Sequence, residues 1–128
     1  MIDPQTFVTF EVDLPDDVEL SEAGDIVIPG GRNVCNELIQ MLKSEGVKVS
    51  DPIQRDYYGW EVSIQLRDQK FWILLQGGER WLLLVERRSG VLRWIGKSKK
   101  TAFHEFLTLL SAAMKKDKRF RNVSWSSA

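Results

Sequence analysis

Two adjacent apolar runs place the strongest constraint on what this chain can fold into. Residues 71–75 (Phe-Trp-Ile-Leu-Leu) and 81–85 (Trp-Leu-Leu-Leu-Val) are apolar at every position, and Gly77 and Gly78 lie between them. A glycine pair between two apolar runs predicts a β-hairpin. Because both faces of these strands are apolar, other parts of the chain have to cover both, or one face stays open to a partner.

The flanking patterns extend this hairpin into an antiparallel meander. Residues 60–66 alternate between apolar and polar side chains, which is typical of a strand with one buried face. Residues 87–90 (Arg-Arg-Ser-Gly) predict a turn into a last strand, 91–95, so the meander is expected to run from Trp60 to Ile95. Residues 6–14 alternate in the same way and predict one further strand.

Two helical patterns complete the predicted fold. From Arg32 to Ser44, apolar residues recur at three- and four-residue spacings, and Gly46 supplies a stop. Ser98 or Thr101 is expected to cap a second helix, whose apolar stripe extends over residues 103–114. The predicted order is β-α-β-β-β-β-α. It describes an α+β fold with a single layer of antiparallel sheet, a meander of about five strands and two helices.

Length and composition predict one domain. A chain of 128 residues with 43% hydrophobic content suffices for one core, so residues 1–128 are expected to form a single α+β domain. The apolar tail, with Trp125, is expected to pack back on the body. No apolar run reaches the roughly 18 to 20 residues that span a bilayer, and residues 1–10 lack the pattern of a secretory signal, so we expect a cytoplasmic protein. The single cysteine, Cys35, cannot form an intramolecular disulfide, and no metal or cofactor is implied.

Charge is balanced in total but uneven along the chain. Residues 1–33 carry eight acids against Arg32, and residues 87–121 carry eleven cations against two acids. Either the two ends lie together and neutralise each other, or they form two binding faces. If the acidic loop, which includes Asp16 and Asp17, contacts a basic partner, association should slow steeply with salt.

Residues suited to catalysis are few, and their context favours structural roles. His104 is the single histidine and lies in the predicted second helix, where a surface position is expected rather than a general base. Cys35, within the first helical pattern, is expected to be a buried and inert thiol. Asp13, Asp16 and Asp17 could gather a hard cation, but their spacing matches no calcium loop. We therefore expect no enzyme, with an unrecognised carboxylate site at these aspartates as an alternative.

Protein binding is the first functional expectation. If both helices cover one face of the sheet, Trp72, Leu74, Leu82 and Leu84, or their neighbours of opposite parity, form an open apolar patch large enough to expect a partner. Two helices over a meander favour this arrangement, so we expect homodimerisation or binding of another protein through the sheet.

A loop before the meander offers a second contact. Residues 55–58 are expected to be exposed, and tyrosine is well suited to a protein interface. Together with the acidic loop and the sheet, the candidate partner-binding residues are Asp16, Asp17, Asp56, Tyr57, Tyr58 and Trp72.

Nucleic-acid binding is the alternative function. Cations interleaved with aromatic residues can neutralise phosphates and stack on bases, and residues 87–100 partly fit this pattern. Trp94 and Ile95, however, look like strand residues with packing roles, and zero net charge gives no general attraction to a polyanion. The residues that would contact nucleic acid are Arg87, Arg88, Arg93, Lys97, Lys99 and Lys100.

Pro29-Gly30 opens the first predicted helix, Gly59-Trp60 opens the meander, and Val123-Ser124-Trp125 lies near the C-terminal end of the sequence. In these short motifs the chain resembles a family of small bacterial α+β proteins. This resemblance spans nearly the whole domain and implies the fold, but it implies no activity for any residue. The architecture is also similar to that of bacterial immunity proteins, which bind and silence a toxin. That second resemblance implies a protein-binding surface without catalytic residues.

Overall fold

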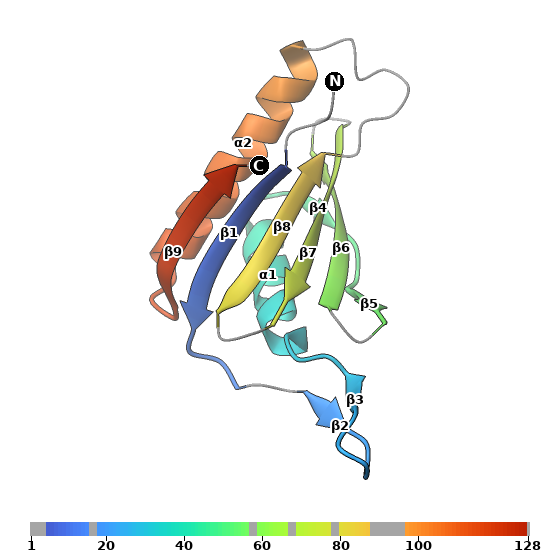
Figure 1. Cartoon of the computed structure of the whole chain (residues 1–128). Helices are drawn as coiled ribbons and strands as arrows, with labels where there is room; N and C mark the ends of the chain where they lie inside the picture. Colours follow the sequence, from blue (N-terminus) through green and yellow to red (C-terminus); the bar gives the residue numbers. More distant parts are fainter. Residues whose placement is uncertain are drawn as a thin grey trace.

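The computed structural model describes residues 5–15, 18–56, 59–66, 69–77, 80–87 and 97–127 (Figure 1). The strands of its main sheet are β1 (Gln5–Val12), β4 (Lys48–Val49), β5 (Ile53–Arg55), β6 (Gly59–Leu66), β7 (Gln69–Gln76), β8 (Trp81–Arg87) and β9 (Phe120–Ser127). A separate two-stranded sheet consists of β2 (Glu19–Leu20) and β3 (Ile26–Ile28). The described helices are α1 (Arg32–Ser44) and α2 (Lys97–Lys116).

The main sheet is antiparallel, with the strand order β4-β6-β7-β8-β1-β9. β5 also pairs with β6, so β4 and β5 together form one interrupted edge strand beside it. The consecutive pairing of β6, β7 and β8 confirms the core of the predicted meander. Its expected last strand, Val91 to Ile95, lies outside the described residues.

Gly59 lets β6 begin at a very short distance from its neighbour. A Cβ atom at this position would lie 2.4 Å from the backbone oxygen of Leu75, which is closer than real Cβ contacts. Only a residue without a side chain fits between the strands here. A close approach of the two backbones therefore accounts for a glycine at this position.

Both described helices pack on the same face of the main sheet, behind it in the view of Figure 1. The core between the two layers includes Phe10, Phe71 and Leu83 from the strands and Leu38 and Phe106 from the helices, each at most 1% exposed. The rings of Phe71 and Phe106 stack with their centroids 5.4 Å apart. The one-face arrangement favoured by the sequence is thus observed, and neither described helix covers the opposite face of the sheet.

The element boundaries confirm some predictions and correct others. The first helix spans Arg32 to Ser44 as expected, but α2 already includes Lys97, so Ser98 and Thr101 lie inside it and the predicted caps were wrong. The tail packs on the body as expected, and it does so as strand β9. This strand and the short β4 and β5 bring the main sheet to seven strands, against about five expected. Neither described helix has an apolar stretch long enough to cross a membrane.

The acidic start and the basic end of the chain meet in the sheet. β1 pairs with β9, and Nη2 of Arg121 lies 2.7 Å from Oδ1 of Asp13. Arg119 instead forms ion pairs with Asp117, at 2.6 Å, and Glu37, at 2.9 Å. The side-chain hydrogen bond that Arg119 donates to Asp117 holds the pKa of this carboxyl below its usual value. Neutralisation between the two ends is therefore local, and within the described residues it does not extend to Glu19, Glu22 or Asp25.

Candidate functional site

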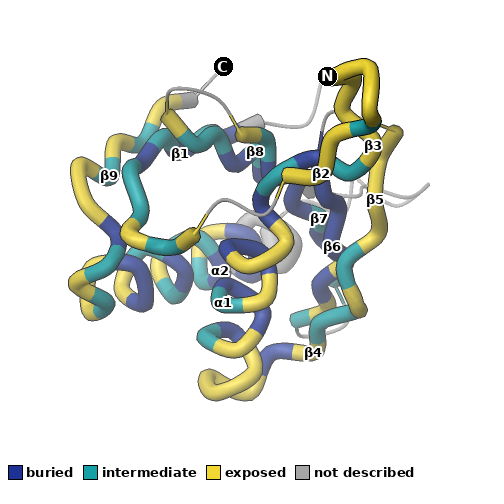
Figure 2. The backbone as a smooth tube through the Cα atoms, turned by 90° about the horizontal axis from the view of Figure 1, so that it is seen from below, coloured by how far each residue is buried: buried dark blue, intermediate teal, exposed yellow. Residues whose placement is uncertain are grey.

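The exposed large apolar side chains of the described residues gather at one corner of the molecule. They are Val18, Leu20, Ile26, Val27 and Ile53, and between 37% and 58% of each residue is exposed. The first four belong to the β2–β3 hairpin and its approach, and the last belongs to β5. Figures 1 and 2 both place β3 beside β5, and Figure 2 shows this corner mostly exposed. We call this surface, residues 18–28 with Ile53–Arg55, the hairpin end.

Gln54 holds the hairpin against the edge of the main sheet. Its side-chain amide donates to the carbonyl oxygen of Val27 at 3.2 Å and to that of Asp56 at 2.8 Å. Asp56 follows β5 in a left-handed conformation, with φ of 44°, which turns the chain toward β6. The described β2–β3 hairpin, which belongs to the acidic segment, therefore lies beside β5 and Asp56.

Trp60 anchors the base of the hairpin. Its indole Nε1 donates to the carbonyl oxygen of Pro29 at 3.1 Å in a buried hydrogen bond, and the guanidinium carbon of Arg32 lies 5.0 Å from the ring centroid. In the sequence between Pro29 and Arg32, Gly31 has a φ of 111°, and a Cβ atom at this position would lie 2.8 Å from the ring of Trp81. The chain thus leaves the hairpin along a fixed path into α1.

A polar turn orders the tip of the hairpin. The backbone N–H of Ser21 donates to the carbonyl oxygen of Asp25 at 2.8 Å, and the Ser21 hydroxyl accepts from the N–H of Asp25 at 3.2 Å. The N–H of Gly24 closes the turn on the carbonyl oxygen of Ser21 at 2.9 Å. These local hydrogen bonds stabilise a hairpin whose strands are too short to be stable alone.

Exposed carboxylates belong to the same segments as the exposed apolar side chains. We call them the acidic rim: Glu19, Glu22, Asp25, Asp51 and Asp56, all exposed. The first three lie on the hairpin, and the last two flank β5. Among the residues that the structure describes, none of them forms an ion pair. Their charges therefore face solvent.

The predicted partner residues fall in different places. Asp56 lies directly after the last residue of the hairpin end and belongs to the acidic rim. Trp72 lies on the sheet face opposite the helices, half-buried in β7. Asp16, Asp17, Tyr57 and Tyr58 lie outside the described residues. The exposed apolar side chains of the hairpin were not predicted as a site. The three apolar residues 26–28, between Asp25 and Pro29, could have indicated it, because so short a strand cannot cross a core.

The sheet face opposite the helices carries a continuous apolar row. Phe7 lies opposite Leu84, which lies opposite Leu74, and Leu74 lies opposite Glu61. Phe7 and Leu84 are half-buried, and Leu74 is buried. The row ends at the buried Glu61, whose Oε2 lies 2.6 Å from Nη2 of Arg55. Because these side chains pack against one another, this face exposes less apolar surface per residue than the hairpin end, and dimerisation through it stays a prediction.

The residues considered for catalysis do not form a site in the described part of the chain. Cys35 is buried in α1, and burial raises the pKa of its thiol to about 12, so the reactive thiolate is suppressed near neutral pH. His104 is exposed on α2. Asp13 forms its ion pair with Arg121. No group of three or more described His, Cys, Asp and Glu residues could hold a metal ion.

The nucleic-acid alternative rests on side chains that the structure does not describe. Arg88 and Arg93 lie outside the described residues. Arg87 ends β8, and Lys97, Lys99 and Lys100 lie at the start of α2, where only the backbone is described. Nucleic-acid binding through these residues therefore stays a prediction.

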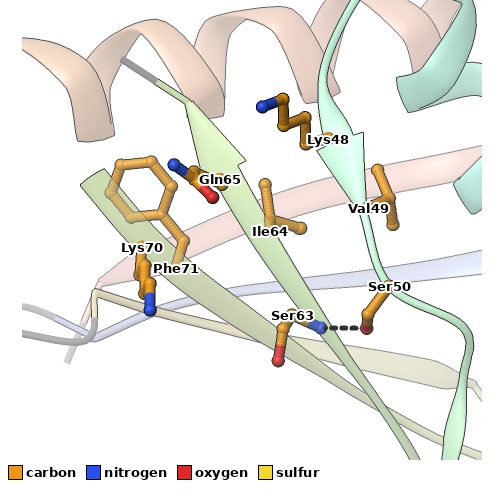
Figure 3. Close-up of a pocket in the computed structure, with 8 residues that line it drawn as sticks. All are labelled: Lys48, Val49, Ser50, Ser63, Ile64, Gln65, Lys70 and Phe71. Atoms are coloured by element: carbon orange, nitrogen blue, oxygen red, sulfur yellow. Dashed lines mark hydrogen bonds between the residues drawn. The ribbon is translucent and has the colours of Figure 1, made fainter. Parts of the chain in front are cut away.

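A shallow pocket of about 340 Å³ lies at the edge formed by β4, β6 and β7 (Figure 3). The hydroxyl of Ser50 accepts a hydrogen bond from the backbone N–H of Ser63 at 2.9 Å within it. The ammonium groups of Lys48 and Lys70 lie apart and point in different directions in Figure 3, so they do not converge on one anion. The described lining contains no histidine, cysteine or carboxylate, and the pocket offers no pairing of nucleophile and base.

No protein-family model, curated protein or solved structure matches this chain.

Proposed function

We propose that this protein is a non-enzymatic protein-binding module and that the hairpin end is its contact surface. The observation that carries the proposal is the concentration of exposed large apolar side chains at this one corner of the described structure. Folded domains rarely gather such side chains unless a partner removes them from water. Inhibition of a toxin by an immunity-type protein is one form of this function, and the architectural resemblance supports it.

The attachment of the hairpin supports the same proposal. Gln54 ties β3 to β5, Trp60 ties Pro29 to the main sheet, and Ser21 closes the turn. A surface that is ordered before its partner arrives loses less conformational entropy on binding. The sheet and helices thus serve as a rigid base for a small protruding contact surface (Figure 1).

The proposal is tested by quantitative affinity capture from native lysate, comparing the tagged wild type with the double variant Leu20→Ser and Ile26→Ser. These two residues are 58% and 45% exposed, so each has about half of its apolar surface left to bury. We expect each to contribute roughly 1 kcal/mol and the double variant to bind about 30-fold more weakly.

The matched control is the double variant His104→Ser and Ala112→Ser, at two exposed positions of α2. It should retain the partner at the wild-type level. Equal capture by the hairpin variant and the control would contradict the assigned surface, and recovery of nucleic acid in place of protein would favour binding through residues 87–100.

A further inference from the structure

We infer that the partner presents a cationic apolar segment to the hairpin end, an inference that rests on the proposed function. The same corner carries exposed apolar side chains and the acidic rim. A segment that combines large apolar residues with lysine or arginine satisfies both properties, because the apolar side chains bury surface while the cations meet the carboxylates.

Two cations, Arg55 in the hairpin end and Arg32 at the start of α1, contact groups of the main sheet. Nη2 of Arg55 lies 2.6 Å from the buried carboxylate of Glu61 on the sheet face. Arg32 lies over the ring of Trp60, at 5.0 Å from its centroid. These contacts direct both guanidinium groups toward the main sheet, so the acidic rim determines the sign of the electrostatic potential at the exposed corner.

This charge distribution selects among possible partners. A nucleic acid or an anionic lipid surface would bring negative charge against the acidic rim and is therefore disfavoured. A cationic protein segment is attracted from a distance, within the screening length of about 8 to 10 Å at physiological ionic strength. The inferred partner is thus a protein with a basic, partly apolar contact surface.

A second copy of this chain fits the hairpin end poorly. Within the described residues, exposed large apolar side chains lie at this corner alone, so another copy could offer such side chains only through its own hairpin end. That symmetric contact would place Glu19, Glu22 and Asp25 against the same residues of the other copy. Like charges across an interface disfavour association, so a different molecule is the better occupant.

The test uses two peptides of equal length and leucine content, one alternating leucine with lysine and the other with glutamate, each titrated into the full chain by calorimetry. The leucine–lysine peptide should bind the wild type, and binding should weaken as salt rises. The triple variant Glu19→Gln, Glu22→Gln and Asp25→Asn should bind it about tenfold more weakly, since each exposed charge contact is worth a few-fold in affinity.

A charge-matched control separates the local effect from net charge. The variant Glu45→Gln, Thr108→Lys and Ala112→Lys makes the same change in net charge at exposed positions of the helical layer. It should bind the leucine–lysine peptide within about twofold of the wild type. Failure of that peptide to bind, equal binding of both peptides, or equal weakening in the two triple variants would overturn the inference.

Failure of the inference can be told apart from failure of the proposed function. If the partner captured from lysate depends on Leu20 and Ile26 but not on Glu19, Glu22 and Asp25, the protein-binding proposal stands and the cationic partner is refuted. If capture depends on neither set, the proposed function itself fails. A concentration-dependent dimer in light scattering that Leu20→Ser dissociates would show a second copy as the occupant and would also overturn the inference.

Discussion

Replacement of Trp60 by phenylalanine tests whether the hairpin end is anchored as the structure indicates. The change keeps an aromatic ring in the core but removes the Nε1–H that donates to Pro29 at 3.1 Å, and it weakens the contact with Arg32. Loss of a donor to a buried carbonyl costs about 1 to 3 kcal/mol, and a weaker cation–π contact costs about 0.5 kcal/mol. The smaller ring adds a loss of roughly 1 kcal/mol through lost packing.

Trp125→Phe is the matched control. The Nε1 of Trp125 is buried and has no hydrogen-bond partner in the described part of the chain. Removing it relieves an unsatisfied donor, which offsets much of the lost ring packing. We therefore expect Trp60→Phe to lower the free energy of unfolding by about 2 to 4 kcal/mol more than Trp125→Phe does.

Urea denaturation followed by far-ultraviolet circular dichroism measures this difference. With a denaturant slope of about 2 kcal/mol per molar urea, the two midpoints should differ by about 1 M or more. Trp60→Phe should also speed hydrogen exchange at the turn amides of Ser21 and Gly24, because the base of the hairpin loses its anchor. Equal midpoints with unchanged exchange at these amides would refute the reasoning.

Three further predictions concern the rest of the fold. Gly59→Ala should destabilise the protein by about 1 to 3 kcal/mol in the same assay, because its Cβ would meet the backbone of β7 at 2.4 Å, whereas Gly77→Ala meets only a side-chain ring at 3.3 Å and should cost less. The folded-state pKa of Cys35, about 12, lies above its ordinary value of 9.0, so between these pH values unfolding releases a proton from this thiol. As the pH rises through this range, the free energy of unfolding should therefore fall by up to about 1.4 kcal/mol per pH unit, and Cys35→Ala should remove that contribution. Asp13→Asn should change the free energy of unfolding by less than about 1 kcal/mol, because its ion pair with Arg121 is exposed, and a larger loss would contradict a merely local contact.

The parts of the fold that could be predicted are those with a long, regular pattern. Helix α1 from Arg32 to Ser44 follows from a clear spacing of apolar residues and a glycine stop. The hairpin of β7 and β8 follows from two apolar runs around a glycine pair. The placement of both helices on one face was favoured only by the order of the elements, because strands that are apolar on both sides do not reveal which side is covered.

Strand β9 could not be predicted because its pattern is interrupted. Asn122 adopts a left-handed conformation with φ of 52°, and the pairing with β1 shifts register between Thr9 and Glu11. Its partner strand lies at the opposite end of the chain, so no local signal links the two. β4 and β5 contain two and three residues and are too short to show any periodicity.

Only part of the hairpin end could be predicted from the sequence. The exposure of Asp56, which precedes a strand, follows from residue type and position. Leu20 and Ile26, in contrast, look like core residues, and their exposure follows from where the fold puts them. The β2–β3 hairpin lies outside the main sheet, and no described helix covers it (Figure 1).

Chemical-shift mapping with the isotope-labelled protein and the leucine–lysine peptide tests the central claim most directly, because it shows where on the fold a cationic apolar segment binds. We expect the largest changes at the amides of residues 18–28 and Ile53–Asp56, with little change at Trp72 and Leu84 on the open sheet face. Changes centred on the sheet face, or spread evenly over the surface, would contradict the assignment of the hairpin end as the contact surface.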